Sequence, residues 1–159
     1  MDVIGEGSTS LIKISGQLGY VEKRYKRPHR LRLAPTEKEI HAQISPLLEK
    51  AKSPLRTPIL LPHLVAYVME EVKTDRPLWH EEVWSGLSKH IQETLLSSLK
   101  TAFKALWAQG YNMRDVEVYL QPDNTLVVLD FGQVTMALPS EEFSLQSAAV
   151  VPPEVAKLF

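Results

Sequence analysis

The sequence predicts an α+β fold in which an antiparallel sheet with one helix precedes a mainly helical half. Three observations support this. Short apolar runs with period-two alternation, separated by Gly and Pro, occupy much of residues 1–75. Residues 85–110 repeat apolar side chains every four positions, which indicates a long buried helix. Two β-prone runs, 118–121 and 126–129, flank residues with turn chemistry and predict a hairpin.

Length and composition exclude several classes of protein. A chain of 159 residues fits one compact unit that buries about 70% of its extended surface. The absence of cysteine excludes disulfides and Cys-ligated zinc. A net charge of −1 offers no field to hold nucleic acid, and the basic run 23–32 is typical of a solvated strand and loop. No stretch approaches the ~20 apolar residues of a membrane span, and we do not expect the residues from Met1 to Val3 to open a signal peptide.

The predicted hairpin carries an acidic motif at each end. Arg114-Asp115 stands before it, and Asp130-Phe131-Gly132 follows it, so that Asp115 lies fifteen positions before Asp130. Phosphoryl transfer needs two such carboxylates in one place, one to orient the attacking hydroxyl and one to hold Mg²⁺. An ordinary strand that ends in an Asp-Phe-Gly turn is the alternative for this stretch taken alone.

Two earlier segments carry features that suit a nucleotide. Gly5, Gly7 and Ser8 lie at the predicted bend of a hairpin, where backbone N–H groups can approach a phosphate, although an ordinary hairpin fits equally. Alternation over residues 20–25 places Lys23 among apolar neighbours on one face of a strand. A strand-end lysine that reaches solvent is the alternative.

A helix is predicted from Pro35, with Thr36 as its N-cap and Glu39 at capping-box spacing. Glu37 lies on the apolar stripe of this helix and Glu39 does not, so Glu37 is the predicted partner of Lys23. Two solvated first-turn glutamates are the alternative. Ser45-Pro46 predicts that the helix breaks and restarts.

Two further strands are predicted at residues 58–62 and 64–72, the second apolar enough to be covered on both faces. The long helix at residues 85–110 should stop at Gly110. His80 and His90 have no ligand partner at metal-binding spacing, and we expect them at the surface.

Taken in order, these motifs resemble those of the protein-kinase superfamily. The matching positions are Gly5, Gly7 and Ser8 of the Gly-rich loop, Lys23, Glu37, the hinge at residues 69–72, Arg114-Asp115 and Asp130-Phe131-Gly132. The resemblance implies a minimal bilobal protein-kinase-like fold, with an antiparallel-sheet N-lobe at 1–75 and a truncated helical C-lobe at 76–159. The chain is similar to the very compact kinases that bacteria inject into host cells as effectors or that phages carry.

The resemblance also implies roles for these residues. Asp115 would orient the substrate hydroxyl and Arg114 would brace its loop, while Lys23, held by Glu37, would contact the phosphates of ATP. Gly5, Gly7 and Ser8 would cover these phosphates. Met69 would be the gatekeeper, the backbone from Glu70 to Val72 would face the adenine, and Asp130 would bind Mg²⁺.

The implied function is ATP- and Mg²⁺-dependent transfer of phosphate to Ser, Thr or Tyr of a protein substrate, such as one in a host cell. The implied location is the cytoplasm, or a host cell reached without a classical signal peptide. The sequence leaves the substrate and the oligomeric state open.

Departures from the family pattern leave alternatives. Ser10 replaces the third glycine of the loop, Met113 stands where the family has His, and Leu120 stands where a metal-binding Asn is expected. Glu117, just before the hairpin strand, is a candidate metal ligand in a shortened loop, or else an exposed strand residue. A pseudokinase that binds a partner or nucleotide without transfer is therefore the alternative function. A small-molecule kinase is disfavoured, because we see no spare segment for a substrate pocket.

Overall fold

A computed structural model of the chain describes residues 3–7, 10–26, 34–52, 54–62, 66–113, 116–131 and 134–136. Within these ranges the protein is α+β, as the sequence predicts, with a five-stranded antiparallel sheet, helices and two smaller sheets. This arrangement is compatible with a small two-lobe fold. None of the described helices is long and apolar enough to span a membrane.

The five-stranded sheet has the order β1-β2-β3-β6-β5, and every neighbouring pair is antiparallel. Its strands are β1 (Val3–Glu6), β2 (Ser10–Ile14), β3 (Tyr20–Tyr25), β5 (Leu60–Leu61) and β6 (Tyr67–Glu70). The predicted hairpin of β1 and β2 and the alternation of β3 are thus confirmed. Strand β6 is shorter than the predicted strand at 64–72, of which residues 64 and 65 lie outside the described ranges.

Helix α1 (Ala34–Ala51) corrects two predictions. It begins before Thr36, which lies in the first turn and is not the N-cap, and it continues through Pro46 without a restart. A proline inside a helix costs about 3 kcal/mol, but burial of side chains such as Ile44 and Leu48 stabilises by roughly 1.5–3 kcal/mol each. Because these residues lie on both sides of the exposed Pro46 and pack in one core, a continuous helix is favoured.

The predicted helix at 85–110 begins four residues later in the structure, at Lys89, and a separate short helix precedes it. A short helix, α2 (Glu81–Ser85), ends at Gly86, and α3 (Lys89–Ala108) begins after Ser88, whose side chain accepts a hydrogen bond from the Ile91 amide at 3.2 Å. This N-cap fixes the true start of the long helix. Its end is as predicted, because Gly110 follows the C-cap with a φ of 92°, a conformation that favours glycine.

The predicted hairpin is confirmed as β8 (Glu117–Leu120) and β9 (Leu126–Leu129). A strand that the sequence did not predict, β4 (Leu55–Arg56), pairs with β9 in parallel and completes a three-stranded sheet. Strands β7 (Tyr111–Asn112) and β10 (Thr135–Met136) form a two-stranded sheet, and β7 packs against α3. Two residues per strand are too few for a period-two pattern, which explains why β4 was missed.

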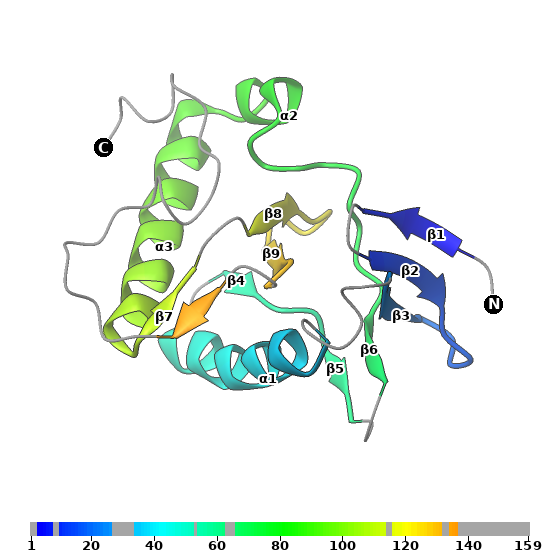
Figure 1. The fold of residues 1–159 in the computed structure, drawn as a ribbon. Helices are drawn as coiled ribbons and strands as arrows, with labels where there is room; N and C mark the ends of the chain where they lie inside the picture. The colour runs from blue at the N-terminus through cyan, green and yellow to red at the C-terminus, as the bar shows by residue number, and fades with distance from the viewer. Residues whose placement is uncertain are drawn as a thin grey trace.

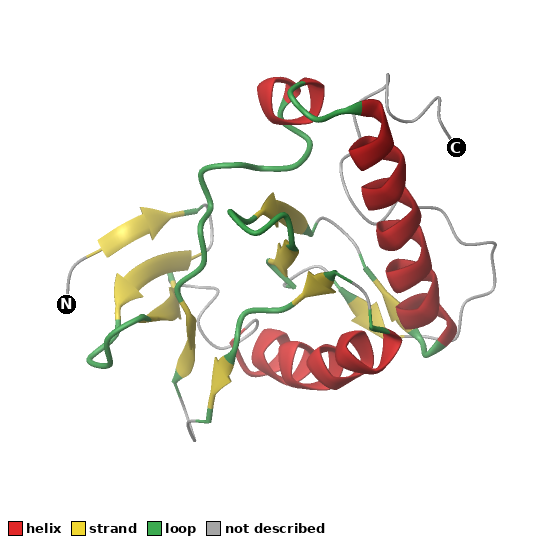
Figure 2. Ribbon diagram, turned by 180° about the vertical axis from the view of Figure 1, so that it is seen from behind, coloured by secondary structure: helices red, strands yellow, loops and turns green. Residues whose placement is uncertain are grey.

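The β8–β9 hairpin lies between the five-stranded sheet and α3 (Figures 1 and 2), and α1 lies below β4 and β7 in the view of Figure 1. The segment that links β6 to α2 crosses from one side of the molecule to the other. It is tied to the hairpin, because the Leu78 amide bonds the Val118 carbonyl at 2.9 Å and the side-chain amide of Gln121 bonds both the N–H and the C=O of Lys73. The hairpin is therefore fixed relative to the sheet.

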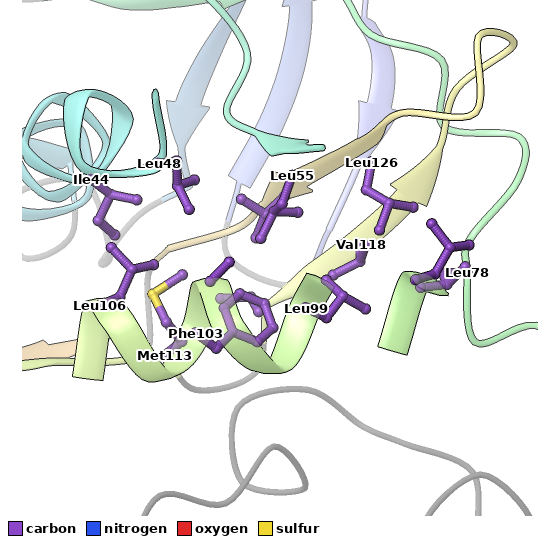
Figure 3. Close-up of a cluster of buried hydrophobic side chains, with 14 of the residues drawn as sticks. Ile44, Leu48, Leu55, Leu78, Leu99, Phe103, Leu106, Met113, Val118 and Leu126 are labelled. Atoms are coloured by element: carbon purple, nitrogen blue, oxygen red, sulfur yellow. The ribbon is translucent and has the colours of Figure 1, made fainter. Parts of the chain in front are cut away.

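The main hydrophobic core joins α1, α3, β4 and the hairpin. Figure 3 shows it from the side, with side chains from all of these elements meeting above α3: Ile44, Leu48, Leu55, Leu78, Leu99, Phe103, Leu106, Met113, Val118 and Leu126. A second cluster of Val21, Tyr67 and Met69, with Ile12, Leu60 and Leu129 packed against it, joins the five-stranded sheet to β9. The side chains of Glu37 and His41 are polar and yet buried, so each must have hydrogen-bond partners inside the protein.

Candidate functional site

Lys23 and Glu37 form a nearly buried ion pair. The alternation of β3 turns Val21, Lys23 and Tyr25 inward, and only 9% of the Lys23 side chain is exposed. Its Nζ lies 2.6 Å from Oε1 of Glu37, whose side chain is 2% exposed. Glu39 is exposed. The predicted pairing is therefore confirmed, together with the choice of Glu37 over Glu39.

The Glu37 carboxylate also binds two further donors. Its Oε2 accepts a hydrogen bond from the hydroxyl of Tyr25, and its Oε1 accepts a second one, at 3.2 Å, from the amide of Phe131. A buried carboxylate requires such partners, because a carboxylate without them is very costly to bury. One side chain of α1 thus connects strand β3 to the chain just after β9.

Asp130 lies at the open side of this pair. Its side chain is 49% exposed, and its Oδ1 is 3.4 Å from Nζ of Lys23. The backbone of Asp130 has a φ of 69°, which for a residue other than glycine costs roughly 1–2 kcal/mol. Strain of this kind is commonly found at functional sites. The structure therefore brings together Lys23, Glu37 and Asp130, which the sequence assigned to one site.

A buried histidine extends the cluster. His41 lies one turn after Glu37, and its Nε2 faces the Pro58 carbonyl at 2.8 Å. Because a carbonyl only accepts, Nε2 carries the proton, and Nδ1 accepts from the Tyr67 hydroxyl at 2.7 Å. The Phe131 ring lies 5.3 Å from the imidazole, centroid to centroid. Burial, aided by the charge of Lys23 and opposed by the bond to Pro58, lowers the pKa of His41, which favours the neutral ring.

Glu117 lies at the same end of the hairpin as Asp130, because its partner across the strands is Leu129. Its carboxylate is exposed and accepts a hydrogen bond from the Tyr119 hydroxyl at 2.6 Å. Burial, with a further contribution from Glu117, raises the pKa of Tyr119, so the phenol remains a donor. Exposed oxygen ligands of this kind suit Mg²⁺, which often binds through one or two carboxylates plus substrate phosphates.

No group of three or more His, Asp or Glu side chains that could hold a metal ion occurs among the described residues. A Mg²⁺ ion bound by Asp130 would therefore have few protein ligands among these residues, and phosphate or water oxygens would have to complete its coordination.

Part of the predicted hinge, residues 69–72, is already hydrogen-bonded to neighbouring backbone. Met69 is buried in the second cluster and lies opposite Val21 of β3. The amide of Glu70 donates to the Ile59 carbonyl at 2.8 Å, and that of Glu71 donates to the Gly19 carbonyl at 2.9 Å. The backbone of Val72 has no hydrogen-bond partner within the described part of the chain. Among the described residues, the amide of Val72 is therefore unpaired.

The side chain of Glu70 is directed elsewhere. It binds Arg56 through two hydrogen bonds, of 2.8 and 3.2 Å, and accepts a third from the Ile59 amide. Burial opposes ionisation, but these bonds lower the pKa of Glu70 below its usual value. The pair borders a hollow of about 630 Å³ between α1 and β4, which neither Lys23 nor Asp130 lines. Any contact of Glu70 with a nucleotide would therefore be made by its backbone.

The glycine-rich bend is only partly free to bind phosphate. The amide of Gly7 donates to the Ser10 carbonyl at 2.9 Å, which closes the hairpin, and Gly5 lies in β1 opposite Ile12. Ser8 lies outside the described residues, as do Arg114, Asp115 and Gly132. The roles assigned to these four residues and the phosphate-binding role of the loop remain predictions.

Several residues of the site were not recognised from the sequence. Tyr25 and His41 carry detectable signals, since they lie two residues after Lys23 on a strand and four after Glu37 on a helix, on the same faces. Arg56 and Gln121 carry none, because their partners are distant in the sequence.

A comparison of the sequence with protein-family models and with curated proteins finds no match.

Proposed function

We propose that this chain is a protein kinase that uses ATP and Mg²⁺ to phosphorylate Ser, Thr or Tyr of a protein substrate, on a minimal bilobal kinase-like fold. The observation that supports this most strongly is the buried Lys23–Glu37 pair with Asp130 beside it. A lysine fixed by a buried glutamate could hold a phosphate, and an exposed carboxylate 3.4 Å away could hold a metal ion that neutralises phosphate charge. The positive φ of Asp130 agrees with this proposal, because backbone strain is common at functional sites.

In this proposal each residue has one task. Lys23 binds the α- and β-phosphates, Glu37 orients Lys23, and Asp130, with Glu117 as a second ligand, holds Mg²⁺. The metal, when bound, would neutralise charge on the phosphates. Asp115 would orient the substrate hydroxyl, with Arg114 bracing it, on the basis of the sequence resemblance.

Binding of ATP is the first test. At 100 times its Kd, a ligand stabilises the native state by about 2.7 kcal/mol, so ATP with Mg²⁺ should raise Tm and ATP without metal should raise it less. Asp130→Asn should remove most of the Mg²⁺ effect. Asp123→Asn, in the exposed turn of the same hairpin, is the matched control and should retain it. The absence of any shift at millimolar ATP and Mg²⁺ would count against kinase and nucleotide-binding pseudokinase alike.

A pseudokinase is the second candidate, and two observations favour it. Leu120, at the position where the family has a metal-binding Asn, is buried in the core, and the Glu117 carboxylate is already bonded to Tyr119. If Glu117 is a metal ligand, Glu117→Ala should lower the transfer rate at least ten-fold, or about 1.4 kcal/mol in the barrier. Full activity of Glu117→Ala would mean that Glu117 does not bind a required metal ion. A wild-type protein that transfers no phosphate would favour the pseudokinase.

A further inference from the structure

Tyr25 contacts both members of the Lys23–Glu37 pair. Its hydroxyl donates to Oε2 of Glu37, and its ring lies 5.6 Å from Nζ of Lys23, within the range of a cation–π interaction. Both contacts arise because Lys23 and Tyr25 are two residues apart on β3 and so share a face. The tyrosine side chain is buried, so the contacts are shielded from water.

The two oxygens of Glu37 have different partners. Oε1 accepts from Lys23 and from the Phe131 amide, and among the described residues Oε2 accepts only from Tyr25. Tyr25 therefore fixes the rotation of the carboxylate and leaves Oε1 facing the lysine. Without the hydroxyl, a buried oxygen would have no donor, and the carboxylate could rotate away from Lys23.

We propose that Tyr25 is a positioning residue, whose hydroxyl holds Glu37 so that Lys23 stays in place for the phosphates of the nucleotide. This inference rests on the proposed function in assigning phosphate binding to Lys23. Its geometric part concerns only the three side chains and is independent of catalysis.

The position of Asp130 gives the proposal a specific consequence. Nζ of Lys23 is 2.6 Å from Glu37 and 3.4 Å from Asp130, so a lysine that loses its hold on Glu37 has a second carboxylate within reach. Asp130 is also the proposed ligand of Mg²⁺, and a lysine paired with it would compete with the metal. Loss of the Tyr25 hydroxyl should therefore raise the Mg²⁺ concentration needed for half-maximal transfer.

The hydroxyl remains a donor at any working pH. Burial, and then the charge of Glu37, raise the pKa of Tyr25 well above its usual value. Any pH dependence measured at this site therefore cannot come from ionisation of Tyr25.

The first experiment does not require catalysis. Acylation of Lys23 by an activated ester, followed by peptide mass spectrometry, measures how firmly its ammonium is held. We expect a several-fold faster reaction in Tyr25→Phe than in wild type, and no change in Tyr111→Phe, which removes a hydroxyl bonded to Gln43 outside the site. Replacement of Tyr25 by 4-aminophenylalanine keeps the ring and a donor and should restore slow acylation. Equal rates in wild type and Tyr25→Phe, with both folded by urea titration, would overturn the proposal.

The second experiment measures transfer. Tyr25→Phe should lower kcat/KM about ten-fold, which corresponds to about 1.4 kcal/mol, and should raise the Mg²⁺ requirement. Because Tyr25 acts through Glu37, Tyr25→Phe should add little to the loss in Glu37→Gln, whereas fully additive losses would contradict the proposal. Faster acylation in Tyr25→Phe with unchanged transfer in that variant would also contradict it. Faster acylation with no transfer in wild type would support the positioning by Tyr25 and reject the kinase function.

Discussion

Replacement of Glu37 by glutamine tests the buried pair with little change of shape. The amide keeps one oxygen, but it brings an NH₂ group into a site where Lys23, Tyr25 and the Phe131 amide are all donors. It also removes the negative charge that faces the Lys23 ammonium. In Glu37→Gln, Asp130 at 3.4 Å would be the remaining carboxylate near Nζ of Lys23 among the described residues.

The expected loss follows from this environment. Removal of one partner from a buried ion pair costs about 3–5 kcal/mol, because it leaves a charge without compensation. The lower end of this range applies to Glu37→Gln, because the amide oxygen still accepts one hydrogen bond and Lys23 can move toward Asp130. We therefore expect Glu37→Gln to lower the free energy of unfolding by about 3 kcal/mol, a large part of the 5–15 kcal/mol typical of a domain.

Urea unfolding followed by tryptophan fluorescence measures this loss, and Glu39→Gln is the matched control. Glu39 lies on the same helix, two residues away, and is exposed, so its substitution should change stability by no more than about 0.5 kcal/mol. A loss in Glu37→Gln as small as that in Glu39→Gln would refute the reasoning, because it would mean that the carboxylate is not held as the structure describes.

Two further predictions concern His41 and Gly110. The folded state lowers the pKa of His41, so below about pH 6.5 the unfolded chain binds a proton that the folded chain does not, and the free energy of unfolding decreases as the pH is lowered. Between about pH 7.5 and 5.5 this loss should reach at most about 1.4 kcal/mol, and His41→Gln should flatten the profile measured by urea unfolding; an unchanged slope would contradict it. Gly110→Ala should cost about 1–2 kcal/mol because of its positive φ, whereas Gly16→Ala, with open space around it, should cost less; equal losses would argue against the left-handed turn.

Much of the fold could be predicted because its signals are local. The alternation of β3, the apolar stripe of α1 and the turn chemistry between β8 and β9 each lie within one segment. The same local reasoning chose Glu37 over Glu39, since only Glu37 shares the helix face of Ile40, and this face packs in the core.

The remaining features depend on tertiary contacts. Pro46 should end a helix by its local preference, but packing on both sides of it keeps α1 continuous. The strand β4 is defined by its pairing with β9, and the Arg56–Glu70 and Gln121–Lys73 contacts join positions far apart in the sequence. No pattern within a short window could indicate these features.

Transfer of labelled phosphate from γ-labelled ATP tests the central claim most directly. Wild type and Asp123→Asn, incubated with Mg²⁺ and a cell lysate, should both label protein. Asp130→Ala should reduce the label by more than ten-fold, a loss above about 1.4 kcal/mol in the barrier, and Asp115→Ala should abolish it while ATP binding persists. Equal labelling by wild type and Asp130→Ala would contradict the account, because the carboxylate beside Lys23 would then have no part in transfer.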